Sequence, residues 1–514
     1  MDTSLAPDPP FRVITEMIHE HALARPTQPA VIAGDARLSY AELDRSMDRV
    51  AAALQREGLR PGDTIAICAN SSARYVAVFL GALRAGVVVA PLAPSVTAAS
   101  FASMLADAQA TLLFVDAAAN ELLPAAGDNI RVIRLDEDAP GLAFEHWLGS
   151  DANAAPAPVQ VQPAWPFNII YSSGTTGTPK GIVQSHGMRW SHVMRGANYL
   201  YGPDGVTLLA TPLYSNTTLV VFLPTLAWGG TVLLMPKFDA AGYLSLAQDH
   251  RATHTMLVPV QYQRIMALPQ FARFDLSSFR FKFCTSAPFS AALKADVVER
   301  WPGGLVEFYG MTEGGGTCIL EAHAHPSKLH TVGLPAPGHD IRLIDDEGRE
   351  VPPGETGEVV GHSGGMMNGY HGQPAKTREA EWFDPQGKRF IRTGDVGRFD
   401  ADGFLTLLDR KKDMVISGGF NIYPSDLEAV LRTHPGVAEA AVVGVPSEQW
   451  GETPVAFVVL REGETLTAET LLRWVNEQVG KTQRLADLRC VAELPRSAIG
   501  KILKRELRDS WLAR

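Results

Sequence analysis

Residues 11–310 alternate between stretches of helical periodicity and short apolar runs. Apolar side chains recur at helical spacing over 11–23, 40–57 and 72–85, while Thr64–Cys68 and 87–90 are short and mostly apolar. We expect the second of these runs to end at Pro91. Helices that alternate with buried strands fold as layers on a sheet. The pattern therefore predicts α/β layers in the first half of the chain.

The alternation returns after a connection rich in proline and alanine at 152–166, which we expect to be exposed. Two related α/β lobes are therefore predicted. A strand is expected at 167–172, directly after this connection. The second group of elements, between about 205 and 310, comprises strands at 206–210, 231–235 and 255–258, and helices at 219–227 and 240–248.

The pattern changes at about residue 330 to glycine, proline and short strands, and a charged run at 409–413 precedes a compact tail. The fold class predicted is α/β: a large N-terminal domain, 1–409, of two α/β lobes plus a β-rich lobe, and a small α+β C-terminal domain, 414–514. The expected strands are Asp340–Ile344, 357–360, 404–408, 437–444 and 454–460, and the expected helices of the tail are Pro424–Thr433 and 467–479.

Composition excludes several classes of protein. The 514 residues are 46% apolar, which is too apolar for a disordered chain, and the net charge of −10 argues against a nucleic acid as the main partner. Four scattered cysteines indicate neither a disulfide framework nor a zinc site. No stretch approaches the roughly 18 uncharged apolar residues of a membrane span, and the N-terminus does not resemble a signal peptide. We expect a cytoplasmic protein without stable membrane insertion.

The most informative segment is 171–181, with the sequence Tyr-Ser-Ser-Gly-Thr-Thr-Gly-Thr-Pro-Lys-Gly. Glycines let backbone N–H groups approach phosphate oxygens, hydroxyls donate further hydrogen bonds, and Lys180 supplies positive charge. It is not a Walker loop, because Pro179 precedes the lysine and 181–183 continues as a strand. A flexible turn between two strands is the alternative.

The whole string resembles the signature loop of the adenylate-forming (AMP-binding) superfamily, which joins acyl-CoA synthetases, adenylation domains of peptide synthetases and luciferases. Other motifs of that superfamily follow in order over nearly the whole chain. The resemblance implies an enzyme that couples a carboxylic acid to ATP, giving an acyl adenylate and pyrophosphate. It also implies that the β- and γ-phosphates lie in the loop, against Thr175, Thr176, Gly177, Thr178 and Lys180.

A second signature is matched at 308–313, Phe-Tyr-Gly-Met-Thr-Glu. By resemblance, Tyr309 would stack on adenine, Thr312 would bond the α-phosphate and Glu313 would hold Mg²⁺. A cation is needed because the attacking carboxylate and the triphosphate repel each other. Taken alone, Tyr309 would be interpreted as a buried aromatic residue at a strand end.

Two further segments resemble parts of the nucleotide site. Asp395 matches the family aspartate that accepts both ribose hydroxyls, for which a carboxylate offers paired acceptors, and Arg410 matches an arginine that reaches the ribose. The small-residue loop beside the purine is matched by Ser286, Ala287 and Pro288. Ordinary turns and a helix cap are the alternatives for these residues.

The C-terminal tail resembles the family's small domain, which rotates between adenylation and thioester formation. Lys501, after Gly500, would bridge the carboxylate and the α-phosphate, although a solvated basic tail is the alternative. Lys412, within 410–413, falls on the family's hinge position. Gly418 and Gly419 would then leave room for pantetheine, or simply form a tight turn.

Two hypotheses concern the partners of this mobile domain. Trp450 resembles a position where coenzyme A ligases place an aromatic residue near the nucleotide end of CoA, although it could equally pack on its own domain. A lysine acetyltransferase that modified Lys501 would remove the charge on which adenylation depends. The sequence leaves a homodimer open.

The predicted acyl pocket carries serine at position 215, where many aryl and acyl ligases have histidine and amino-acid-activating members have aspartate. Without that aspartate a buried ammonium group would lack a partner, which argues against an amino acid. The resemblance favours an aryl, alicyclic or medium-chain acid, with CoA as the acceptor. A freestanding enzyme that loads an acyl carrier protein is the alternative, and a non-catalytic nucleotide-binding protein is a third. The pocket residues predicted are Tyr214, Ser215, Thr285, Gly310 and Met311.

Overall fold

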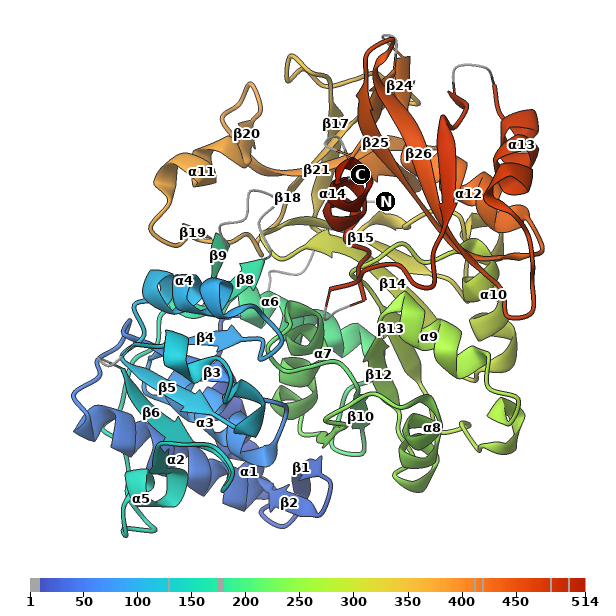
Figure 1. The fold of residues 1–514 in the computed structure, drawn as a ribbon. Coiled ribbons are helices and arrows are strands. Elements are labelled where there is room, and N and C mark those ends of the chain that lie inside the picture. Colours follow the sequence, from blue (N-terminus) through green and yellow to red (C-terminus); the bar gives the residue numbers. More distant parts are fainter. Residues whose placement is uncertain are drawn as a thin grey trace, which may run out of the picture.

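The computed structural model describes residues 10–127, 130–172, 180–410, 413–417, 420–480, 483–497 and 500–513. Two α/β lobes, a β-rich lobe and a smaller C-terminal unit follow one another along the chain (Figure 1). The predicted α/β class and its division into a large N-terminal and a small C-terminal part are thus confirmed. The exact boundary at 409 and the hinge stay predictions, since Lys412 lies outside the described residues.

The first lobe is built on a sheet whose central strands are parallel and buried. All five residues of Thr64–Cys68 are buried, as expected for a parallel strand covered on both faces. The strand order is β19-β9-β8-β4-β3-β5-β6-β7. The strands are β3 (Thr64–Cys68), β4 (Val88–Leu92), β5 (Leu112–Val115), β6 (Arg131–Arg134), β7 (Leu142–Ala143), β8 (Pro166–Ser172), β9 (Lys180–Ser185) and β19 (Gly369–Tyr370). The helices are α2 (Tyr40–Arg56), α3 (Ala73–Arg84), α4 (Ala98–Ala108) and α5 (Phe144–Leu148).

The second lobe has a sheet of order β16-β15-β14-β13-β12-β10-β11-β1-β2. Three of its parallel strands, β10, β11 and β12, were predicted, each within one residue of its observed bounds, whereas the parallel strands β13 and β14 were not predicted. The strands are β10 (Val206–Leu209), β11 (Thr231–Leu234), β12 (His254–Leu257), β13 (Phe281–Cys284), β14 (Gly304–Met311), β15 (Gly314–Glu321) and β16 (Leu334–Pro335). The helices are α6 (His186–Gly196), α7 (Asn216–Ala227), α8 (Ala240–Asp249), α9 (Pro259–Met266) and α10 (Ala291–Arg300).

One edge of this second sheet comes from the start of the chain. After α1 (Ile14–Ala24), strands β1 (Pro29–Ala33) and β2 (Ala36–Ser39) form a hairpin, and β1 pairs in parallel with β11. The sequence did not predict the pairing of β1 with β11, because a short strand has no sequence pattern that identifies a partner strand far along the chain.

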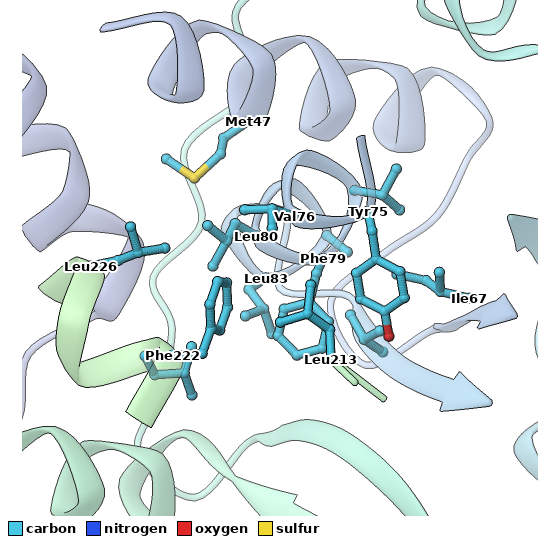
Figure 2. Packing of buried hydrophobic residues seen from close by; sticks show 14 of the residues in the cluster. Met47, Ile67, Tyr75, Val76, Phe79, Leu80, Leu83, Leu213, Phe222 and Leu226 are labelled. Atoms are coloured by element: carbon cyan, nitrogen blue, oxygen red, sulfur yellow. The ribbon is translucent and has the colours of Figure 1, made fainter. Parts of the chain in front are cut away.

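The two lobes share one hydrophobic core. Figure 2 shows Phe79 and Leu83 of α3 facing Phe222 and Leu226 of α7, with Met47 of α2 above them in the view. The rings of Phe79 and Phe222 are 6.4 Å apart and nearly perpendicular, at 88°. Because close-packed cores resist sliding, the lobes are fixed relative to each other.

The β-rich lobe is an antiparallel sheet of order β17-β18-β21-β20, with β22 paired to β21. Its strands are β17 (Asp340–Ile344), β18 (Thr356–His362), β20 (Glu381–Phe383), β21 (Arg389–Phe399) and β22 (Leu405–Arg410), and its helix is α11 (Pro374–Glu379).

The C-terminal unit has a sheet of order β24-β23-β26-β25, with β27 beside β26. The predicted helix Pro424–Thr433 is found with the same bounds, while β27 and α14 were not predicted. The elements are β23 (Val415–Ser417), β24 (Phe420–Ile422), α12 (Pro424–Thr433), β25 (Val437–Ser447), β26 (Gly451–Leu460), α13 (Ala468–Gln478), β27 (Asp487–Cys490) and α14 (Lys504–Leu512).

One predicted boundary is wrong: β4 does not end at Pro91 but continues to Leu92. Proline cannot donate to a neighbouring strand, so it is expected at strand ends and edges. Here β8 pairs with β4 only at Val89, so the missing N–H of Pro91 interrupts no ladder on that side.

A helix that spans a membrane must be long and mostly apolar. None of the helices in the described residues combines the length and the apolar character needed to cross a membrane.

Candidate active site

A cleft of about 2730 Å³ runs between the lobes and the C-terminal unit. The structure brings to its walls residues that lie more than 300 positions apart in the sequence, such as Lys180 and Lys501. The predicted site residues that line it are Lys180, Tyr214, Ser215, Thr285, Ser286, Ala287, Pro288, Tyr309, Gly310, Met311, Thr312, Glu313, Asp395, Arg410 and Lys501.

Among the described residues, one predicted site residue is not brought to this cleft. Trp450 follows β25, does not line the cleft and is 51% exposed. The loop residues Thr175, Thr176, Gly177 and Thr178, the hinge residue Lys412, and Gly418 and Gly419 lie outside the described residues.

Three side chains from neighbouring strands form one end of the cleft. The Tyr309 hydroxyl of β14 donates to Asp395 Oδ2 at 2.8 Å, and Arg410 Nε lies 3.1 Å from Asp395 Oδ1. Asp395 and Arg410 are paired across β21 and β22, so the ladder itself fixes their distance. Burial and the charge of Asp395 raise the pKa of Tyr309 well above its usual value, which keeps the phenol protonated as a donor.

The loop after β13 is held in an unusual conformation. Ser286 has φ +80°, a region that non-glycine residues rarely occupy. Its hydroxyl lies 2.6 Å from Thr217 Oγ1 of α7, and Thr285 Oγ1 donates to the Phe308 carbonyl at 2.8 Å. Hydrogen bonds to α7 and to β14 therefore hold residues 285–286 at the wall of the cleft.

The turn between β14 and β15 carries Thr312 and Glu313. Glu313 Oε1 accepts a hydrogen bond of 2.8 Å from the Tyr370 hydroxyl, and Lys180 Nζ lies 5.0 Å from the centre of the Tyr370 ring. Gln184 Nε2 of β9 donates to the Thr312 carbonyl at 2.7 Å. A carboxylate at the hydroxyl and an ammonium group over the ring thus meet at one tyrosine.

The strands that flank the glycine-rich loop are braced by residues that the sequence did not single out. The Tyr171 hydroxyl of β8 donates to Asp107 Oδ2 of α4 at 2.7 Å, and the His371 amide donates to the Gly181 carbonyl at 2.7 Å. The carboxylate of Asp107 thus holds β8 directly before residues 173–179.

Lys501 reaches the cleft from a tight loop of the C-terminal unit. Arg496 Nη1 donates to the Gly500 carbonyl at 2.8 Å and also pairs with Glu439 of β25. Gly500 has φ +77°, and a Cβ atom placed there would come within 2.8 Å of Val260 in α9. The loop that carries Lys501 therefore packs directly on the N-terminal part.

A deeper wall of the cleft was not predicted. Helix α6 contributes His192, Arg195 and Gly196, and apolar or aromatic side chains surround them. Basic residues recur at 186, 189, 192 and 195, but at 3.6 residues per turn the first and last of them point to opposite sides of the helix, so the spacing did not indicate a cavity-facing side. The other residues of this wall are Tyr199, Val220, Val221, Pro224, Phe283 and Phe308.

Known proteins resemble this chain over almost its entire length. Two family models match: AMP-binding enzyme over residues 18–371, and AMP-binding enzyme C-terminal domain over residues 426–501. A feruloyl-CoA synthase from Amycolatopsis sp is 36% identical over 491 residues, covering 94% of this chain and 96% of the relative. The fatty acid–acyl-carrier-protein ligase ScoC from Streptomyces coeruleorubidus is 33% identical over 518 residues, covering 98% and 97%.

Solved structures agree with these matches. ATP-bound MatB from Rhodopseudomonas palustris is 30% identical, with a TM-score of 0.86 over 97% of this chain and 99% of that one. The first family model alone spans more than half of the chain and most of the residues that line the cleft. The chain therefore belongs to the AMP-binding enzyme family.

Proposed function

We propose that this enzyme is an ATP-dependent carboxylic acid:CoA ligase. In the first half-reaction, a carboxylate oxygen of the acid attacks the α-phosphorus of ATP, and the bond to pyrophosphate breaks. In the second, the thiol sulfur of CoA attacks the acyl carbon, and AMP leaves. The observation that carries the proposal is the meeting of Lys501, Glu313 and Asp395 in one cleft, since each comes from a different part of the chain.

Each of these residues has a role that its chemistry supports. Asp395, held by Tyr309 and Arg410, offers carboxylate oxygens to the ribose hydroxyls. Lys501 would stabilise the negative charge that develops as the carboxylate approaches the α-phosphate. The loop 173–179 would hold the β- and γ-phosphates, with Lys180 at its end. The ATP-bound state of the structurally similar MatB supports a nucleotide in this cleft.

The donor set fits Mg²⁺ held mainly by substrate. No group of three or more His, Cys, Asp or Glu side chains within the described ranges is arranged as a metal site. Glu313 offers one carboxylate beside the cleft, and Mg²⁺ at nucleotide sites commonly takes one or two carboxylates plus phosphate oxygens and water. When bound there, the cation would neutralise charge on the triphosphate.

The second half-reaction depends on features that we propose from the resemblance. The C-terminal unit would rotate about 410–413 with Lys412 as the hinge, bringing Gly418 and Gly419 to the cleft beside pantetheine. Trp450, exposed in the present arrangement, would meet the nucleotide end of CoA. Homodimer formation and acetylation of Lys501 stay hypotheses of the same kind.

We propose an aryl, alicyclic or medium-chain acid as the substrate. The wall formed by Val220, Pro224, Phe283 and Phe308 is apolar, and Ser215 at its rim offers no partner for the ammonium group of an amino acid. The similarity to a feruloyl-CoA synthase supports both the aryl acid and CoA. The similarity to ScoC supports the second candidate, transfer to an acyl carrier protein.

The test is pyrophosphate release across a panel of aryl, alicyclic and short- to medium-chain acids, with and without CoA. At least one acid should release pyrophosphate, and CoA should increase turnover and give a thioester detectable by mass spectrometry. Reactions without acid are the control for ATP hydrolysis. Release with no thioester would move the acceptor to a carrier protein, and no release with any acid would contradict the ligase.

A further inference from the structure

One face of α6 carries three basic side chains in succession. Arg189, His192 and Arg195 are spaced three residues apart, so they lie along one side of the helix. Arg189 is fully buried, and its guanidinium donates to Asn168 Oδ1 at 3.0 and 2.9 Å and to Gln184 Oε1. These acceptors are neutral amides, so they satisfy its hydrogen bonds without cancelling its charge.

Arg195 is the arginine of this series that lines the cleft, whereas Arg189 does not. The guanidinium carbon of Arg195 lies 5.2 Å from the centre of the Phe308 ring. In the part of the chain that the structure describes, no Asp or Glu forms an ion pair with Arg195, and the nearby Tyr199 phenol is neutral near pH 7 because burial raises its pKa to about 12. Burial lowers the pKa of Arg195, which indicates a cation in a poorly solvated place.

The imidazoles around Arg195 add hydrogen-bonding capacity but no compensating negative charge. Burial, Arg195, Arg189 and His339 all lower the pKa of His192, so its ring is neutral near pH 7. His339 has a pKa of about 4 through burial and the charges of Arg195 and His362, and its Nδ1 accepts from the Thr317 amide at 2.9 Å. Among these groups two arginines carry fixed positive charge, and of the two only Arg195 lines the cleft.

A positive charge in such a position is costly without an anion. Removing an ion from water is unfavourable unless a partner of opposite charge replaces the solvent. The aromatic face of Phe308 provides a weak cation–π partner, worth about 0.5–2 kcal/mol, which falls short of a full ion pair. The site is therefore built to gain most from a ligand that brings a negative group to Arg195.

The reacting carboxylate cannot be that group if the proposed function is correct. It must reach Thr312 and Lys501, whereas the Arg195 guanidinium lies over Phe308 of β14, four residues before Thr312, where Val220 and Phe283 also line the cleft. We propose that the substrate carries a second carboxylate, separated from the first by an apolar body, and that Arg195 binds it. A planar guanidinium can donate two parallel hydrogen bonds to a carboxylate, which gives both affinity and orientation. This inference rests on the proposed function and narrows its substrate class to dicarboxylic acids.

The test compares acids that differ only in their far end. Terephthalate against para-toluate, cyclohexane-1,4-dicarboxylate against its monomethyl ester, and octanedioate against octanoate are the probes, with pyrophosphate release and acyl adenylate mass as readouts. The wild type should use at least one diacid with a kcat/KM about 30-fold or more above that of its matched monoacid, as for other charge pairs removed from water.

Variants of Arg195 test whether this residue causes the preference for diacids. Arg195→Met, which keeps length without charge, should remove this preference mainly through KM for the diacid and should spare or improve the monoacid. Arg195→Lys should restore part of the preference. The matched control is Arg273→Met, at an exposed arginine outside the cleft, which should change neither substrate.

The outcomes separate this inference from the proposed function. If monoacids are adenylated at least as well as their diacids for every pair, the second carboxylate is refuted while the ligase stands, even if Arg195→Met fails to fold. Equal loss of both acids in a folded Arg195→Met protein would make Arg195 a structural residue. If no acid of either kind is adenylated, both proposals fail.

Discussion

Lys501 lines the same cleft as Thr312 and Glu313, although the strands of the β-rich lobe lie between them in the sequence. Its ammonium group belongs to the C-terminal unit, whereas the phosphate-facing turn belongs to the second lobe. A charge that acts only in one arrangement of the two parts should matter for only one half-reaction.

We therefore expect Lys501→Ala to lower acyl adenylate formation by roughly 10²–10³-fold or more, the effect of removing one preorganised charge from a transition state. CoA transfer from supplied acyl adenylate should be nearly unchanged. Single-turnover assays of each half-reaction measure this, with Lys237→Ala at an exposed lysine as the control. Equal loss in both half-reactions would contradict the alternation between arrangements.

For individual residues, the sequence singled out polar side chains that contact one another in the structure, but it did not single out Arg195. Tyr309, Asp395 and Arg410 belong to short strings that can be read directly, and the structure brings them together. Arg195 was missed because nothing next to it in the sequence reveals that it faces a cavity. Only the packing of α6 against β14 places its charge over Phe308.

Among the elements, the loop before α14 combines two constraints at one glycine. Gly500 requires both a positive φ and the absence of a side chain, because Val260 of α9 lies against it. Gly463, after β26, has φ +86°, and a Cβ atom placed there would meet nothing within 4 Å, so it shares only the first constraint.

Gly500→Ala should therefore lower the rate of adenylation well beyond any effect of Gly463→Ala, since it also pushes the Lys501 loop away from α9. Thioester formation from supplied acyl adenylate should be spared. Adding Val260→Ala to Gly500→Ala should recover part of the lost rate by removing the close contact. If the two glycine variants behave alike, backbone conformation alone explains the effect.

Elements with a strong local pattern were predicted well. Pro424–Thr433 has a proline at its first turn and a clear apolar stripe, and its bounds agree with the structure. The end of β4 was wrong because the rule about proline depends on which neighbouring strand is present, and a single sequence does not contain that information.

For the whole molecule, buried histidines predict how stability depends on pH. His186 and His254 are buried, and desolvation lowers the pKa of each to about 4 from an ordinary value near 6.5. Between these values the unfolded chain binds more protons than the folded one. The free energy of unfolding should therefore fall as the pH drops from about 6.5 to 4, by up to about 3 kcal/mol for each histidine.

The contribution of His254 can be measured by comparing urea unfolding of the wild type and His254→Gln at several pH values. Nε2 of His254 donates to the Tyr199 carbonyl at 2.7 Å, and a glutamine amide could replace that donor. The wild type should lose stability relative to the variant as the solution is acidified through this range. The exposed His330→Gln is the control, and parallel pH curves for wild type and His254→Gln would refute the assignment.

The hairpin β1–β2 has a consequence for how the chain is made. Val31 of β1 leaves the ribosome long before Val232, its pairing partner in β11. The opening strand, with its buried Ala30, Val31 and Ile32, must wait in the nascent chain without its partner while the first lobe is being translated. A chain that stalls or is cut before β11 emerges would leave an apolar strand edge uncovered, which is a site for aggregation or chaperone binding. The pairing of β1 with β11 therefore cannot form until β11 has been translated, long after β1 itself.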